Sequence, residues 1–219
     1  MRYIFPLTVF GLLAGVSATE IVSKPAVQDA AGWEIGPDVR GRNYSVGMPL
    51  QPTHNRKGGW SFEFPYPNAG VGHVHAVTFN PGSLKNASKI VMRYRIDAAR
   101  GTRFAPQETP DQAATVSLYF QRLGDSWSGK RHYEFYRWYA PAHSVKEITP
   151  GEHEVVVSFA DQNWVSVQGR TVVTNPSAFE YARFETARIG IAFGGPSGRA
   201  HGVYSTGPAK FTLLEFRII

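Results

Sequence analysis

Apolar and polar side chains alternate most clearly in the stretch IVMRYRI, residues 90–96, which places Ile90, Met92 and Tyr94 on one side of an extended chain. A period of two is typical of a β-strand that has one face in a core and the other face in solvent. The same pattern recurs along the chain, and Pro, Gly and Asn separate the repeats. Further strands are predicted within residues 60–64, 71–79, 115–121, 131–139, 152–159, 164–167, 188–193 and 210–218.

The composition agrees with many short strands joined by turns. The 219 residues include 22 glycines and 15 prolines, above the average combined share of about 12%, which argues against a mostly helical protein because these residues favour turns. Hydrophobic residues make up 42% of the chain and aromatic residues 13%, enough to fill a core and to exclude disorder. The absence of cysteine excludes disulfides, thiolate metal sites and cysteine nucleophiles.

One short segment has the features of a helix. Asn175 can act as a cap, Pro176 suits the first helical position, and apolar residues between 178 and 184 form a stripe. Together with the strands, this segment predicts an all-β fold. The expected architecture is a two-sheet antiparallel β-sandwich of the jelly-roll kind, with one short crossover helix near residues 176–186.

The first 18 residues have the features of a secretory signal peptide. Arg2 precedes an apolar stretch over residues 3–16, and small residues at 16–18 suit signal-peptidase cleavage. The apolar stretch is shorter than the roughly 20 residues that a membrane span needs. We therefore predict a secreted or periplasmic protein with a single sandwich domain over residues 19–219 and no membrane span in the mature chain.

The charge of the chain is moderately basic and evenly spread. Lys and Arg number 23 against 17 Asp and Glu, which gives a formal net charge of +6, and no run of five basic residues occurs. A dispersed excess of this kind is typical of a solvated surface, with mild attraction to acidic polymers. No nucleic-acid-binding motif is visible, so we predict no nucleic-acid partner.

The last third of the chain carries a pattern that is similar to a known group of folds. The pattern comprises TPGEH at 149–153, NW at 163–164, the segment around Phe179, IGIAFGG at 189–195, HGVY at 201–204 and FTLL at 211–214. Over about residues 85–219 it resembles the C-terminal half of galactose-binding-like jelly rolls from secreted bacterial proteins, which include carbohydrate-binding modules. The resemblance implies glycan binding without catalysis, with calcium held structurally in some members. It consists mainly of structural glycines and core positions, so it bears on fold more than on function.

Aromatic residues are concentrated in residues 127–139. If residues 131–139 form one strand, alternation puts Glu134, Tyr136 and Trp138 together on one face. Aromatic rings beside polar groups are what sugar binding requires, because sugars present apolar faces ringed by hydroxyls. The cluster either packs into the core and rim or forms an aromatic-lined groove on a concave sheet face. The candidate ligand-binding residues of this cluster are Trp127, Glu134, Tyr136, Arg137 and Trp138.

Three histidines are further candidates. His73 and His75 are two residues apart on a predicted strand, which places both imidazoles on one face about 6.5–7 Å apart. Glu63 or His201 could complete a metal site, but the sequence does not bring a third ligand close, so we predict no metal and expect His73 and His75 to bind ligand hydroxyls. The glycine-rich stretch 194–202 lacks the lysine and spacing of a phosphate loop and is expected to form a turn, with His201 at the rim of a site.

Motifs for catalysis and for cofactors are not found. The chain has no Gly-x-Ser-x-Gly elbow and no pair of carboxylates close in sequence. The loop acids Asp97, Glu108 and Asp111 do not match a calcium-binding loop. We therefore predict no catalytic residues and no cofactor, apart from the structural calcium that the resemblance implies in some members.

The favoured hypothesis is a secreted module that binds a carbohydrate or a cell-envelope glycan without catalysis. One alternative is a polysaccharide-active enzyme on the same fold, either a glycosidase or a lyase. A lyase would use His73 or His75 with Tyr136 and Arg137, because proton abstraction beside a carboxylate needs a base and a neutralising cation. The other alternative is a purely structural role at the cell envelope or surface.

Overall fold

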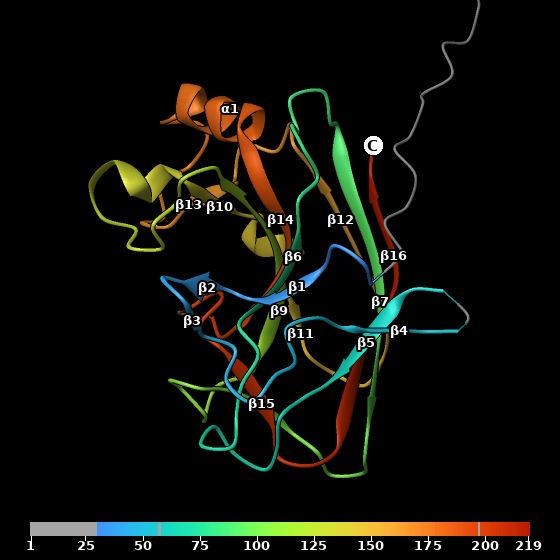
Figure 1. The fold of residues 1–219 in the computed structure, drawn as a ribbon. Coiled ribbons are helices and arrows are strands. Elements are labelled where there is room, and N and C mark those ends of the chain that lie inside the picture. Colours follow the sequence, from blue (N-terminus) through green and yellow to red (C-terminus); the bar gives the residue numbers. More distant parts are fainter. Residues whose placement is uncertain (1–29, 57, 197) are drawn as a thin grey trace, which may run out of the picture.

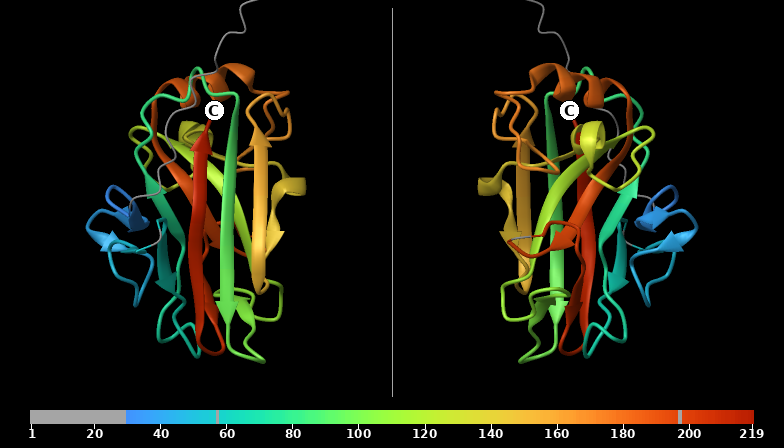
Figure 2. Two further views of the ribbon diagram at one scale, coloured as in Figure 1. Left: turned by 90° about the vertical axis from the view of Figure 1, so that its right-hand side faces the viewer. Right: turned by 90° about the vertical axis from the view of Figure 1, so that its left-hand side faces the viewer.

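Two antiparallel β-sheets face each other in this computed structural model, which describes residues 30–56, 58–196 and 198–219 (Figures 1 and 2). The larger sheet contains, in spatial order, β1 (Glu34–Gly36), β6 (Ala76–Phe79), β14 (Thr186–Gly194), β9 (Thr115–Arg122), β10 (Arg137–Tyr139) and β13 (Val165–Ser166), and β11 (Lys146–Glu147) also pairs with β9. The smaller sheet contains β12 (Gly151–Ser158), β7 (Lys89–Ala98), β16 (Ala209–Ile218), β5 (Trp60–Glu63) and β4 (Thr53–His54). The predicted two-sheet antiparallel sandwich is confirmed. The predicted signal peptide, residues 1–18, lies outside the described residues.

The described residues also contain two small two-stranded sheets and two 3₁₀ helices. One is a hairpin of β2 (Asp38–Val39) and β3 (Arg42–Asn43), and the other sheet pairs β8 (Phe104–Pro106) with β15 (Val203–Ser205), which is distant in sequence. The 3₁₀ helices are η1 (Arg131–Phe135) and η2 (Ala142–Ser144). No helix among the described residues is long and apolar enough to cross a membrane.

Alternation along the strands puts one face of each sheet into a shared core. In β9, Val116, Leu118 and Phe120 are fully buried, and the register aligns Phe120 with Trp138 of β10 and with Ile189 of β14. Each fully buried apolar side chain of this size contributes about 1.5–3 kcal/mol, so the core can stabilise a chain without disulfides. Four tryptophans are fully buried: Trp33, Trp60, Trp138 and Trp164.

The predicted crossover helix is confirmed as α1 (Pro176–Phe184), which lies across one end of the sandwich (Figure 1). Its Phe179 packs against Phe120 and Trp138 in the core, with ring centroids 5.6 and 5.1 Å apart. Its buried Arg183 donates hydrogen bonds to the carbonyl oxygens of Leu84 and Ala87, at 3.1 and 2.7 Å. These bonds attach α1 to the loop between β6 and β7.

The strand predicted over residues 131–139 is wrong in its first half. Residues 131–135 form η1, and only Arg137–Tyr139 are extended, as β10. Aromatic residues favour strands, but here the chain turns so that the Trp138 indole enters the core and its Nε1 donates to the carbonyl of Phe135 at 2.9 Å. The predicted face that combines Glu134, Tyr136 and Trp138 therefore does not exist.

The outer faces of the two sheets differ in how they are covered. The outer face of the smaller sheet carries exposed ion pairs, such as Arg95 with Asp97 at 3.0 Å. On the outer face of the larger sheet, Tyr119, Tyr139 and Ala192 are buried although they point away from the core, because loops cover them and form a second small apolar cluster. A binding site can therefore be enclosed on the larger sheet.

Candidate ligand-binding cleft

The floor of a cleft is formed by one row of residues across the larger sheet. The register aligns Tyr119 of β9 with Gly190 of β14, Gly190 with Thr78 of β6, and Thr78 with Glu34 of β1. These residues alternate with core residues, so their side chains point to the outer face. A Cβ on Gly190 would lie 2.1 Å from the carbonyl oxygen of Val77, so this position has no room for a side chain.

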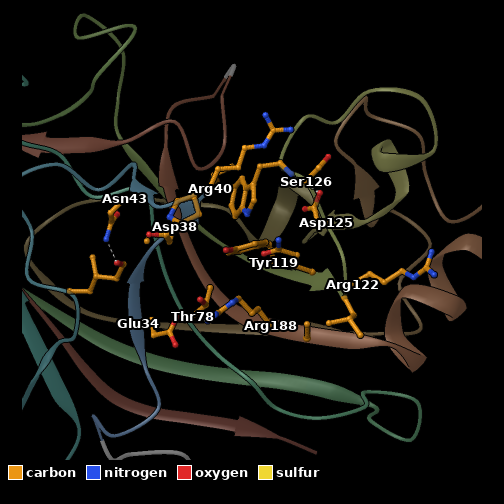
Figure 3. Close-up of a pocket in the computed structure, with 18 of the residues that line it drawn as sticks. Glu34, Asp38, Arg40, Asn43, Thr78, Tyr119, Arg122, Asp125, Ser126 and Arg188 are labelled. Carbon is orange, nitrogen blue, oxygen red and sulfur yellow. Dashed lines mark hydrogen bonds and ion pairs between the residues drawn. The ribbon is translucent and has the colours of Figure 1, made fainter.

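The walls of the cleft come from two segments far apart in the sequence. Figure 3 shows Asp38 and Arg40, from the β2–β3 hairpin, on one side of Tyr119, and Asp125 and Ser126 on the other. The hairpin is attached to β1 because Asn43 Nδ2 donates to the carbonyl of Ile35 at 2.8 Å. The resulting cleft has a volume of about 710 Å³.

A buried ion pair fixes the wall that contains Asp125. The Asp125 carboxylate and the Arg137 guanidinium are 3.0 Å apart, and their side chains are 0% and 4% exposed. Burial raises the pKa of Asp125, and the positive charge of Arg137 opposes this shift. Asp125 Oδ1 accepts a hydrogen bond from the backbone N–H of Trp127 at 2.9 Å, and Arg137 Nη2 donates to the Trp127 carbonyl at 3.2 Å. Both partners of the ion pair therefore hold the backbone of Trp127.

The ion pair of Asp125 and Arg137 positions the indole ring of Trp127. Its backbone has φ of 60°, a conformation that non-glycine residues rarely adopt and that costs on the order of 1 kcal/mol. The Arg137 guanidinium lies 4.1 Å from the centroid of the indole, and the Tyr119 ring meets it edge-on at 6.2 Å. The indole is half-buried and lines the cleft. Anchored backbone and stacked guanidinium together give Trp127 a fixed orientation.

A second hollow, of about 460 Å³, adjoins the first at Trp127. It is lined by Tyr44, His75 and His201, and it shares Arg40 and Trp127 with the cleft. Trp127 therefore lies between two connected hollows on one face of the molecule.

Gln121 lines the cleft but has a buried amide oxygen without a hydrogen-bond partner in the described part of the chain. The residue is only 6% exposed, and its Oε1 has no hydrogen-bond partner among the described residues. A side-chain hydrogen bond from Gln121 to Asp125 helps to lower the pKa of Asp125. This bond uses the amide nitrogen of Gln121 as donor and leaves its amide oxygen without a partner. A buried acceptor without a partner is costly, so Gln121 lowers the stability of the native state at this place.

His75 is a neutral imidazole at the edge of the second hollow. Its Nδ1 lies 2.8 Å from the carbonyl of Ala200, so Nδ1 carries the proton. Burial lowers its pKa to about 4. The His73 ring is also buried, and its centroid lies 4.9 Å from that of His75.

We expect His75 to make stability depend on pH. The unfolded chain protonates this imidazole near pH 6.5 and the native state only near pH 4, so the unfolded state binds more protons between these values. Stability is therefore full above about pH 6.5 and falls by about 3 kcal/mol as the pH drops toward 4. Urea unfolding of wild type and His75→Asn across this range measures the effect, because Asn keeps a donor for Ala200 but does not titrate.

A matched control for this experiment is His143→Asn, which removes an exposed histidine outside the cleft. Its stability is expected to follow the wild-type curve. If His75→Asn loses as much stability on acidification as the wild type does, the protonation of His75 is not the cause.

The structure brings some of the predicted site residues together and separates the others. Trp127, His75 and His201 line the two hollows, and Arg137 lies against Trp127. Trp138 is 0% exposed in the core, so its prediction as a surface ligand residue is wrong. The remaining three predicted residues face neither hollow: Glu134 pairs with Arg170 at 3.4 Å, Tyr136 stacks on Arg122, and His73 is packed beside His75.

Tyr119 and Gln121 of the cleft floor are absent from the set of predicted site residues. Alternation in residues 115–121 already places both on the face opposite the core, so the signal was present. The hairpin residues Asp38 and Arg40 carry no such signal, because only the fold brings them opposite Asp125.

Among the described residues, no group of three or more His, Asp or Glu is placed to hold a metal ion.

Two of the solved structures that are similar to this chain are a binding module and an enzyme. One is a carbohydrate-binding module, CBM28, described as specific for non-crystalline cellulose; it has 13% identity and a TM-score of 0.41, and the match covers 85% of this chain and 86% of that one. The other is Xylanase10C from Cellvibrio japonicus in complex with xylopentaose, with 11% identity and a TM-score of 0.35, matching 86% of this chain and 28% of that one. No protein-family model and no curated protein matches the chain.

Proposed function

We propose that this protein binds a carbohydrate chain in the cleft on the larger sheet, with Trp127 as the ring on which a sugar unit stacks. The observation that carries the proposal is the fixed position of this indole between two connected hollows. A rigid aromatic ring loses little conformational entropy on binding, so it is an effective anchor.

The polar groups around Trp127 suit sugar hydroxyls. Thr78 and Asn43 line the cleft with groups that can donate or accept hydrogen bonds. A sugar presents apolar C–H faces and a rim of hydroxyls, which requires this combination of a flat ring and fixed polar groups.

The proposal includes binding but no chemical step. The carboxylates that line the cleft are already engaged: Glu34 with Arg188 at 2.7 Å, Asp125 with Arg137 at 3.0 Å, and Asp38 with the Gly41 N–H at 3.0 Å. A glycosidase needs one carboxylic acid and one carboxylate free to act on the same bond. The present partners of these carboxylates favour a binding role over catalysis. We propose, as the sequence predicts, that the protein is secreted or periplasmic.

We expect affinity to rise with the length of the oligosaccharide. A chain that stacks on Trp127 and also occupies both hollows makes contacts that a disaccharide cannot make. A hexasaccharide is therefore expected to bind at least about tenfold more tightly than a disaccharide of the same sugar, which corresponds to about 1.4 kcal/mol. Isothermal titration calorimetry with a length series measures this difference, and equal affinities at all lengths would contradict an extended site.

Affinity electrophoresis of the purified protein through gels that contain single polysaccharides tests the function itself. Retardation by at least one polysaccharide is expected. The same polysaccharides are incubated with the protein and assayed for new reducing ends and for absorbance of unsaturated products. Product formation would favour an enzyme instead, and neither retardation nor product on a broad panel would favour a structural role.

A further inference from the structure

Most charged groups of the cleft form ion pairs within the protein. Arg188 Nη1 lies 2.7 Å from the carboxylate of Glu34, and both line the cleft. Arg122 lies 2.8 Å from Glu185, and this hydrogen bond lowers the pKa of Glu185. The negative charge of Asp125 is balanced by Arg137.

The remaining charges of the two hollows also balance. Asp38 and Arg40 have opposite charges and lie two residues apart on the same hairpin wall. In the second hollow, His201 Nδ1 lies 2.9 Å from Glu108, and His75 is neutral because burial lowers its pKa to about 4. Neither hollow has an excess of positive charge among the described residues, although the whole chain has a formal net charge of +6.

This balance disfavours an anionic ligand. A site for carboxylate or sulfate groups needs guanidinium or ammonium groups whose donors are free for the ligand. Here Arg188 and Arg122 already donate to protein carboxylates, so an acidic sugar would have to displace Glu34 or Glu185 to reach them. Arg40 has no carboxylate partner among the described residues, but the negative charge of Asp38 lies two residues away on the same wall and opposes an anion there. Without such a displacement, an anion in the cleft loses hydration and gains at most the guanidinium of Arg40 as a partner.

We infer that the cleft selects uncharged glycans, built from neutral sugars, and rejects polyuronates and sulfated polysaccharides. The inference rests on the proposed function and specifies its class of ligand. It is opposite to the expectation from net charge alone, which favours acidic polymers.

The test compares neutral and acidic polysaccharides at low and high salt. The neutral set is xylan, mixed-linkage β-glucan, mannan and galactan, and the acidic set is polygalacturonate, alginate and hyaluronan. We expect binding to at least one neutral polysaccharide, with a Kd that changes less than about twofold between about 20 mM and about 500 mM NaCl, because no ionic contact is screened. Tightest binding to an acidic polysaccharide, weakened about tenfold or more by the same salt, would overturn the inference.

A variant that removes one carboxylate from the cleft tests the inference directly. Glu34→Gln removes the partner of Arg188 and leaves an exposed cation free in the cleft. We expect this variant to gain about two- to fivefold in affinity for polygalacturonate at low salt, the range of one exposed ion pair. The matched control is Glu63→Gln, which frees Lys210 on the other sheet, outside the cleft, and should show no gain.

The outcomes separate the inference from the proposed function. Binding of acidic glycans alone, or a Glu34→Gln variant that gains no more acidic affinity than Glu63→Gln, overturns the inference and leaves glycan binding in place. Absence of binding to every polysaccharide overturns the proposed function and the inference together.

Discussion

Trp127→Ala is expected to weaken glycan binding by at least about 30-fold, the effect of removing a central aromatic anchor worth about 2–4 kcal/mol. The variant loses the ring between the two hollows, while the backbone contacts of residue 127 to Asp125 and Arg137 involve main-chain atoms and can remain. Calorimetric titration with the best oligosaccharide measures the loss. A thermal melt of the same sample should show a cooperative transition, because the indole is only half-buried.

Two further variants control this experiment. Trp127→Phe keeps a smaller ring at the same place and is expected to bind with intermediate affinity. Phe184→Ala removes an aromatic ring that is 53% exposed at the end of α1 and does not line either hollow, and it should bind like the wild type. Wild-type affinity in Trp127→Ala would show that glycans bind elsewhere.

Asp125→Asn is expected to lower the free energy of unfolding by about 3–5 kcal/mol, because it leaves the guanidinium of Arg137 buried without a compensating charge. Both side chains of this pair are almost fully excluded from solvent. The same change removes an acceptor that holds the backbone of Trp127. Urea unfolding at neutral pH measures the stability, and the glycan titration should show weaker binding as well.

The double variant Asp125→Asn/Arg137→Met tests whether the uncompensated charge is the cause. Replacing both charges removes it, so this variant should be more stable than Asp125→Asn alone. Asp97→Asn breaks the exposed ion pair with Arg95 and should cost less than about 1 kcal/mol. A loss in Asp125→Asn no larger than in Asp97→Asn would mean that the buried pair contributes little.

Most of the fold could be predicted from the sequence because each long strand has one face in the core. Alternation in residues 90–96 and 115–121 correctly identified β7 and β9, and the Asn175-Pro176 start correctly identified α1. In residues 71–79, regular pairing is confined to Ala76–Phe79, because the backbone N–H of His73 instead bonds the carbonyl of Val46 in a loop. Local periodicity could not show this long-range contact.

The site was harder to predict, because it depends on which side of the chain a ring faces. Trp127 and Trp138 both belong to the aromatic-rich residues 127–139, although serines flank Trp127 and tyrosines lie close to Trp138. The structure turns Trp138 into the core through η1 and holds Trp127 outside through a buried ion pair. Asp125 and Arg137 are twelve residues apart, and no pattern in the sequence shows that they meet.

The order of the strands has a consequence for how this protein acquires its structure. β14 lies between β6 and β9 in the larger sheet, and β16 lies between β5 and β7 in the smaller one, so the last two long strands of the chain are central in both sheets. Neither sheet can be complete before residues 186–218 are available. Most of the strands that pair in each sheet are distant in sequence. Such a topology folds slowly, in milliseconds to seconds, and late relative to synthesis. Until these strands are added the floor of the cleft is incomplete, so the arrangement that builds the cleft also delays its formation.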